Sequence, residues 1–158
     1  MKNLIVSCTV FMLGSAAWAG GNYTGNGVGS GTSTTTPHPV ADNHVVLQTS
    51  SSYDKMQMED ASHPLHGGAG PCFGAVEMSA AKVAGHGMCL FTDAGGDVMV
   101  LHWHATGQDD SGALVGDWEI SSGTGKWNGA TGGGQFASKT DPNTGAFVNQ
   151  ITSDITLP

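Results

Sequence analysis

The chain has 158 residues with 25 glycines, about twice the usual ~7%, and only 11% of its residues are charged, against a usual ~25%. Five lysines, no arginine and 13 acidic residues give a formal net charge of -8, which excludes the basic surface that binds nucleic acid or anionic lipid. The length allows one domain, and the composition excludes a coiled coil.

The first 19 residues have the pattern of a secretory signal peptide. Lys2 precedes an apolar stretch at 4–13, and the small-x-small sequence Ala-Trp-Ala at 17–19 predicts cleavage before Gly20. About ten apolar residues are too few for a membrane span, which needs ~20. We therefore expect a periplasmic or secreted protein that has no membrane partner after cleavage.

Residues 20–42 consist mainly of Gly, Ser, Thr and Asn. Such a segment has almost no apolar surface to bury and cannot offset the entropy lost on ordering. The sequence predicts a flexible, disordered leader here, followed by one domain over 43–158.

From Asn43 onward, apolar residues alternate with polar ones in short runs that are separated by turn residues, which predicts an all-β domain. The Asp-Ala-Gly-Gly sequence at 93–96 predicts a hairpin turn. A sandwich or a barrel fits this spacing, and we favour an eight-stranded antiparallel barrel of the allene oxide cyclase or lipocalin type because closure removes free strand edges. The predicted strands are 44–49, 72–78, 87–92, 97–105, 114–121, 126–131, 134–139 and 145–157.

Three cysteines are present, and Cys8 lies in the predicted signal peptide. The remaining pair, Cys72 and Cys89, predicts one disulfide in an oxidising compartment. A reactive or metal-binding thiol pair is the alternative, but the spacing is much longer than that of a redox CxxC motif.

The stretch Ser122–Gly134 (SGTGKWNGATGGG), followed by a long last strand, resembles a signature of the allene oxide cyclase and dirigent barrel superfamily, and in particular of its exported bacterial branch. The pieces GPCFG at 70–74, GMC at 87–89 and DAGGD at 93–97 and the strand around Trp103 are similar in order and spacing. The resemblance covers residues 70–158.

This resemblance implies an eight-stranded barrel with a central cavity that binds a small hydrophobic molecule, and a homo-oligomer, since members often form dimers or trimers. We predict no cofactor. No catalytic residue of the plant enzymes carries over, because the matched positions are turn glycines and packing aromatics. The lack of arginine is a departure from dirigent-like sites and argues against the handling of phenolic radicals.

Aromatic residues are the candidate ligand contacts. Met99, Leu101 and Trp103 share one strand face, which we interpret as the inner one. In the last strand Asn149 and Ser153 lie among apolar residues, where a polar group needs a hydrogen-bond partner from a neighbouring strand or from a ligand. The predicted ligand-binding residues are Trp103, Trp118, Trp127, Phe136, Phe147 and Asn149.

Two side chains are candidates for catalysis. Glu77 alternates with Phe73 and Ala75, which would direct its carboxylate into an apolar cavity where a raised pKa suits a general acid or base. A solvated Glu77 is the alternative, with the face assignment wrong by one residue. Asn149 is the second candidate.

Histidines and methionines give weak metal candidates. His102 and His104 share one strand face and could offer two imidazoles to a metal, but no third ligand is identifiable, so we predict ordinary surface or interface histidines and no metal site. Met56 and Met58, near His63 and His66 in a predicted loop, are a soft ligand set without a recognised spacing. The acids around the hairpin turn at 93–97 are expected to be solvated.

Three functions fit these patterns. The first is an exported binding protein whose barrel holds a small hydrophobic ligand. The second is a cyclase or isomerase that confines its substrate, and the third is a structural or assembly module whose barrel is filled by its own side chains. An open cavity with a carboxylate would favour the enzyme, and an open cavity without a titratable group would favour the binding protein.

Overall fold

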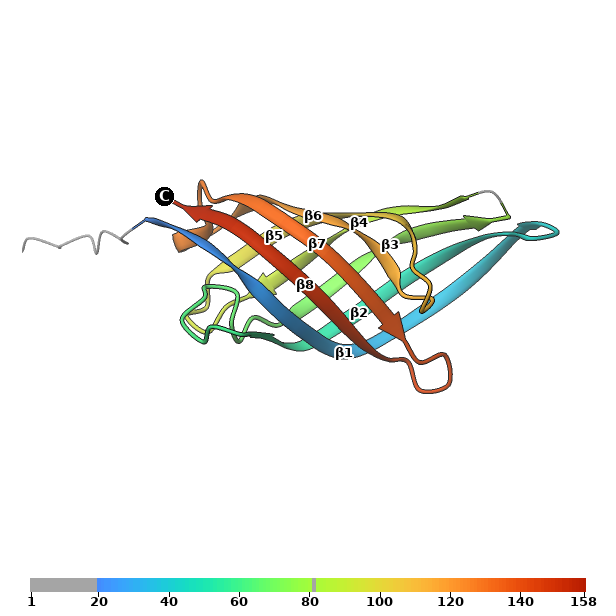
Figure 1. The fold of residues 1–158 in the computed structure, drawn as a ribbon, viewed down its shortest axis with the longest axis horizontal. Coiled ribbons are helices and arrows are strands. Elements are labelled where there is room, and N and C mark those ends of the chain that lie inside the picture. Colours follow the sequence, from blue (N-terminus) through green and yellow to red (C-terminus); the bar gives the residue numbers. More distant parts are fainter. Residues whose placement is uncertain (1–19, 81) are drawn as a thin grey trace, which may run out of the picture.

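A computed structural model describes residues 20–80 and 82–158 and shows a closed barrel of eight antiparallel strands in sequential order (Figure 1). The predicted all-β, eight-stranded antiparallel barrel is confirmed. The predicted signal peptide lies outside the described residues, and no helix among those residues is long and apolar enough to cross a membrane. The elements are β1 (Gly21–Ala41), β2 (His44–Met58), β3 (Gly70–Ser79), β4 (Lys82–Thr92), β5 (Val98–Gln108), β6 (Leu114–Gly123), the 3-10 turn η1 (Gly125–Trp127), β7 (Thr131–Thr140) and β8 (Ala146–Leu157).

The segment predicted to be a flexible leader is the first strand of the barrel. Residues 21–32 of β1 pair with β8, and residues 27–41 pair with β2. Residues 27–32 therefore have a partner strand on each side, β8 on one and β2 on the other. The barrel begins at Gly21 and not at Asn43, so the prediction for 20–42 was wrong.

The composition of β1 hides its alternation, because glycine occupies most of its inward positions. At Gly27 a Cβ would collide with the sulfur of Met58, and at Gly29 it would collide with the ring of Tyr53. The missing side chains of β1 thus leave room for the large inward side chains of β2. The strand has the period of two but lacks the apolar residues by which such a period is normally recognised.

The predicted strand at 126–131 is also wrong. Residues Gly125–Trp127 form η1, and β7 begins at Thr131. The predicted number of strands agrees with the structure only because one false strand replaced the missed β1.

Four strands extend beyond one end of the barrel. β1 pairs with β8 only as far as Thr32 but with β2 to Ala41, and β4 pairs with β3 from Lys82 but with β5 only from Gly85. Figure 1 shows the β1–β2 hairpin and the β3–β4 hairpin extending toward the end opposite the C-terminus. We call this extension the overhang; it comprises residues 33–51, 73–79 and 82–84.

The free edge of the overhang carries two prolines. The amide of Ser33 donates to the carbonyl of Gly145 (2.8 Å), so odd-numbered residues of this stretch direct their N–H groups toward the edge that β2 does not cover. Pro37 and Pro39 stand at odd positions and have no N–H to offer. They limit pairing with a foreign strand at an edge that the barrel does not close.

Cys72 and Cys89 form the predicted disulfide. They are direct partners on β3 and β4, and both are buried on the inner face of the barrel. The disulfide ties together the two strands that run from the barrel wall into the overhang.

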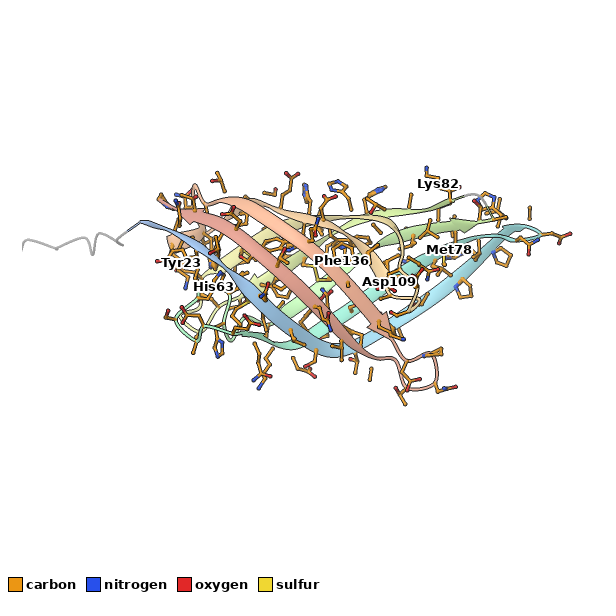
Figure 2. The ribbon with its side chains drawn as sticks, viewed as in Figure 1. Tyr23, His63, Met78, Lys82, Asp109 and Phe136 are labelled. Atoms are coloured by element: carbon orange, nitrogen blue, oxygen red, sulfur yellow. A yellow bond between two sulfur atoms is a disulfide. The ribbon has the colours of Figure 1, made fainter. Side chains whose placement is uncertain are left out.

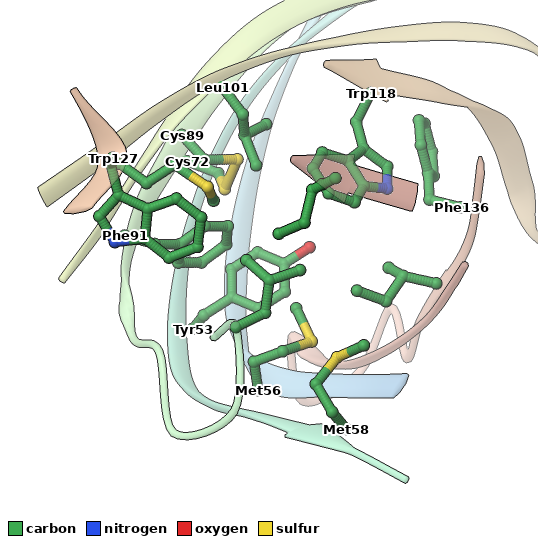
Figure 3. Packing of buried hydrophobic residues seen from close by; sticks show 14 of the residues in the cluster. Tyr53, Met56, Met58, Cys72, Cys89, Phe91, Leu101, Trp118, Trp127 and Phe136 are labelled. Carbon is green, nitrogen blue, oxygen red and sulfur yellow. A yellow bond between two sulfur atoms is a disulfide. The ribbon is translucent and has the colours of Figure 1, made fainter. Parts of the chain in front are cut away.

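The core lies inside the barrel and is concentrated toward the end that holds Gly21 and the C-terminus. Ile155, Met99 and Trp127 are almost wholly buried. Figure 3 shows Trp127 among the packed side chains of this core. Figure 2 shows Tyr23 and His63 at this end of the barrel, which we call the closed end. Met78 and Lys82 lie at the overhang end.

Candidate functional site: the barrel cavity

A cavity of about 150 Å³ occupies the interior of the barrel. Its inner wall is aromatic and aliphatic, and hydroxyl groups line the rim at the overhang end. The inner wall includes Tyr53, Phe91, Leu101, Trp118, Phe136, Phe147 and Ile151, and the rim hydroxyls belong to Ser33, Thr35, Thr49, Ser51, Ser138 and Thr140.

The opposite end is closed by a network centred on Asp93. One carboxylate oxygen accepts hydrogen bonds from Trp127 Nε1 (2.9 Å) and Lys126 Nζ (3.0 Å), and the other accepts from the backbone amides of Gly95 (2.7 Å) and Asp97 (3.1 Å). Burial alone would raise the pKa of Asp93, but the bonds from Lys126, Trp127 and Gly95 together hold it below its ordinary value. Asp93 is buried and paired, so the prediction of a solvated turn acid was wrong.

The SGTGKW sequence completes this network. The backbone amide of Lys126 donates to Asp97 Oδ2 (3.2 Å), and the Lys126 ammonium lies 5.4 Å from the centre of the Trp127 ring. Gly125 has a φ of 50°, and a Cβ there would overlap the Asp97 carboxylate. The most recognisable motif of the chain therefore joins the β4–β5 turn to the β6–β7 turn, a structural role.

The loop between β2 and β3 covers the same end with buried residues. His63 Nδ1 accepts a hydrogen bond from the amide of Leu65 (3.2 Å), and the His63 ring meets the Tyr23 ring edge to face at 6.0 Å. Burial lowers the pKa of His63, although the nearby Asp60 opposes this shift.

Five of the six predicted ligand-binding residues line the cavity, and whether they contact a ligand stays a prediction. Trp103, Trp118, Phe136, Phe147 and Asn149 all face it, and the inward face predicted for β5 is correct. Trp127 instead lies at the closed end, outside this lining.

Trp103 owes its position to two glycines. A Cβ at Gly74 or at Gly87 would overlap the Trp103 ring, so these paired residues of β3 and β4 provide the surface on which the indole lies. A large side chain at the mouth thus rests on strands that carry no side chain beneath it.

The polar part of the cavity is a pair of side chains, Asn149 and Tyr53. Asn149 Nδ2 donates to the Tyr53 hydroxyl (2.7 Å), while Asn149 Oδ1 has no hydrogen-bond partner. Their exposed fractions are only 7% and 9%. Burial raises the pKa of Tyr53 to about 12, although the bond from Asn149 opposes the shift, so the phenol is neutral at physiological pH.

Sequence reasoning missed Tyr53 because the predicted strand ended at residue 49, whereas β2 continues to Met58. Its ring is held edge to face against Phe91 (5.0 Å) and Phe147 (4.6 Å). Figure 3 shows the hydroxyl directed into the space between β2 and Trp118. Continuing the alternation from Thr49 through Ser51 would have placed Tyr53 on the inner face.

Glu77 does not face the cavity. Cys72 and Val76 are buried on the inner side of β3, and the alternation therefore places Glu77 outside, where it accepts a hydrogen bond from His44 Nε2 (2.8 Å). The face assignment was wrong by one residue. Among the described residues that line the cavity, none is an Asp, Glu, Lys or His.

The predicted metal candidates, which all lie within the described residues, do not form a metal site, although Met56 lines the cavity. His102 and His104 lie on the outer face of β5, where His104 Nδ1 pairs with Asp117 (3.3 Å). Met56 and Met58 belong to β2 and are buried in the core, not in a loop. Within residues 20–80 and 82–158, no three His, Cys, Asp or Glu side chains gather where they could hold a metal ion.

No protein-family model and no curated protein matches the sequence. Among solved structures, the pterocarpan synthase dirigent protein GePTS1 matches 87% of this chain and 91% of its own, with a TM-score of 0.54 and 13% sequence identity. The chain has a dirigent-like barrel fold. This likeness in fold extends beyond residues 70–158, the stretch that carries the sequence resemblance, and at this identity it concerns the fold alone.

Proposed function

We propose that this protein binds one small, largely apolar molecule in its barrel cavity. The observation that carries the proposal is the open space of about 150 Å³ behind a wall of aromatic and aliphatic side chains. A cavity of that size in an engineered protein core accepts one benzene molecule. The dirigent-like fold supports the proposal, since the matching protein is named as the synthase of a small molecule.

The lining supports binding more than the two alternatives. A module filled by its own side chains would leave no such space. Acid–base catalysis requires a group that exchanges a proton near neutral pH, and the described lining contains a neutral Tyr53 but no carboxylate or imidazole.

We also propose that the protein works outside the cytoplasm, in the periplasm or the surrounding medium. The Cys72–Cys89 disulfide supports this proposal, since such bonds persist in oxidising compartments. The signal-peptide pattern of residues 1–19 supports it independently. Fractionation of the producing cell should place the protein outside the cytoplasm, with a mass that corresponds to a chain beginning at Gly20; a full-length cytoplasmic chain would contradict the proposal.

Calorimetric titration with toluene tests cavity binding, because toluene carries only the apolar surface that the wall matches. We expect the protein to bind toluene, and Ile151→Trp to weaken the binding at least tenfold by filling the cavity. Gln150→Trp is the matched control, because Gln150 is the preceding residue of β8 and faces outward.

The control should bind toluene as the unchanged protein does, and circular dichroism should show that both variants keep the β-barrel. Failure of the unchanged protein to bind toluene or any neutral or charged aromatic probe of its size, or equal toluene binding by folded Ile151→Trp, would overturn the proposal. If toluene binds as expected, native mass spectrometry of the protein from its producing cell would identify a retained natural ligand by its mass.

A further inference from the structure

One polar pair stands in a cavity whose inner wall is otherwise apolar. Asn149 and Tyr53 come from β8 and β2, and their polar atoms lie 2.7 Å apart on the cavity lining. Asn149 Oδ1 is an acceptor without a partner in a side chain that is more than nine-tenths buried. Buried polar groups normally have partners. Of the three buried side-chain atoms that lack one among the described residues, Asn149 Oδ1 is the one that belongs to the cavity lining, so a ligand atom there would supply the missing partner.

The pair offers one donor and one acceptor whichever way the amide is turned. With Nδ2 donating to the phenol, the Tyr53 O–H and Asn149 Oδ1 are both free for a ligand. With the amide reversed, the phenol donates to Oδ1, and an amide N–H and a phenol lone pair are free instead. A ligand group that both donates and accepts satisfies both arrangements.

We propose that Asn149 and Tyr53 select a neutral ligand that carries a hydroxyl group at its buried end. This inference rests on the proposed binding of a small molecule in the cavity and adds what that molecule must contain. The ligand hydroxyl donates its proton to Asn149 Oδ1 and accepts the proton of the Tyr53 hydroxyl. Two hydrogen bonds then form at a place where a hydrocarbon would form none.

A carboxylate is rejected at the same position. It has no proton to donate to Asn149 Oδ1, and with the amide reversed it accepts a hydrogen bond from the amide N–H but leaves its negative charge uncompensated. It also brings a charge into a lining without any Lys or His among its described residues. The partly buried Lys126 is engaged by Asp93 at the closed end.

Both groups are fixed before any ligand arrives. Tyr53 is wedged against Phe91 and Phe147, and its ring lies over Gly29, where a side chain would displace it. Asn149 is the direct partner of Gly29 across β1 and β8, in a strand whose inward and outward residues alternate without a break. Binding therefore orders neither side chain anew, which favours affinity.

Three probes of similar size test the selection, namely benzyl alcohol, toluene and benzoate, with dissociation constants measured by calorimetry at neutral pH. In a wholly apolar cavity toluene would bind more tightly than benzyl alcohol, because the hydroxyl would lose its water without replacement. We expect the unchanged protein to bind benzyl alcohol at least as tightly as toluene and to bind benzoate at least tenfold more weakly than benzyl alcohol.

The variants Asn149→Leu and Tyr53→Phe should shift the ratio of the two dissociation constants toward toluene, by about tenfold and about threefold respectively. Gln150→Leu, on the outer face of β8, should leave the ratio unchanged. Because the ratio compares two ligands on one variant, a general loss of stability does not produce the shift.

The outcomes separate this inference from the proposed function. Toluene binding with no change of the ratio in Asn149→Leu would overturn the hydroxyl selection and leave cavity binding intact. Tighter binding of benzoate than of benzyl alcohol would also overturn the selection. The absence of binding for all three probes would overturn the proposed function itself.

Discussion

The two ends of the barrel differ in the role of their polar side chains. His63 Nε2 at the closed end and Asn149 Oδ1 in the cavity both lack a hydrogen-bond partner among the described residues, so the difference lies in where the polar groups stand and not in how many are paired. At the closed end the Asp93 carboxylate accepts four hydrogen bonds, and the aromatic and cationic groups around it bond to it or stack on each other. At the open end Asn149 Oδ1 has no hydrogen-bond partner, and hydroxyl groups ring the mouth of the cavity. In the overhang, residues 33–41 of β1 pair with β2 but have no partner strand among the described residues on the other side. The comparison teaches that one end maintains the fold while the other remains available to a ligand.

The largest effect is expected from Asp93→Ala. This change leaves the partly buried Lys126 ammonium and the buried Trp127 N–H without their common acceptor, and breaking a buried pair typically costs about 3–5 kcal/mol. The free energy of unfolding, measured with urea, should fall by about that amount. The control is Asp141→Ala in the β7–β8 turn at the open end, where an exposed carboxylate accepts the Asn143 amide (2.8 Å). A loss for Asp141→Ala as large as that for Asp93→Ala would refute the contrast between the two ends.

Loss of the disulfide should rank second. In the loop-entropy model a bond that closes a loop of this size contributes roughly 3 kcal/mol, and the double change Cys72→Ala with Cys89→Ala removes it. Because this bond joins β3 to β4, we expect hydrogen exchange to accelerate most in 73–79 and 82–84 of the overhang. Uniform acceleration that includes β7 and β8 would show that the overhang does not respond separately from the barrel.

The same contrast explains which parts of the fold could be predicted from the sequence. β5 carries its largest apolar residues on one face, and β8 alternates apolar residues with mostly polar ones, so the inner faces with Leu101 and Phe147 were assigned correctly. β1 was missed because burial there comes from the side chains of β2, which pack over Gly27 and Gly29. A pattern of apolar residues cannot reveal a strand whose contribution is the absence of side chains.

Site residues were predicted where a single strand decides their direction. Asn149 was found because Phe147 and Ile151, which share its face of β8, are apolar. The face of Glu77 was missed because the inner face of β3 is set by Cys72, which pairs with Cys89 on the neighbouring strand. Trp127 was assigned to the cavity because it lay within the predicted strand at 126–131, where an aromatic resembles a lining residue. Its hydrogen bond to Asp93, 34 positions away, fixes it at the closed end, and no local pattern contains that bond.

A change of pH should affect the closed end through His63. Burial lowers the pKa of this imidazole below 6.5, so the unfolded chain binds its proton at a higher pH than the folded chain does. The contribution of neutral His63 to stability is therefore complete above pH 6.5 and is lost as the pH falls through the lowered pKa. We expect the free energy of unfolding to decline modestly from pH 7.5 to pH 5, and His63→Gln to flatten this decline. His86→Gln, on the outer face of β4, should leave it unchanged.

The smallest change in stability is expected from Asn149→Leu, the variant with the strongest expected effect on ligand choice. The substitution removes one hydrogen bond to Tyr53, worth about 1 kcal/mol, but it also removes an unpaired buried acceptor and adds apolar surface to an apolar wall. These contributions oppose each other, so the free energy of unfolding in urea should change by less than about 1 kcal/mol and in either direction. If Asn149→Leu instead lost as much stability as Asp93→Ala, Asn149 would be a structural group like those of the closed end. A small change together with altered ligand choice is the result that a binding role requires, because a residue that is kept for the fold cannot be replaced by leucine without a loss of stability.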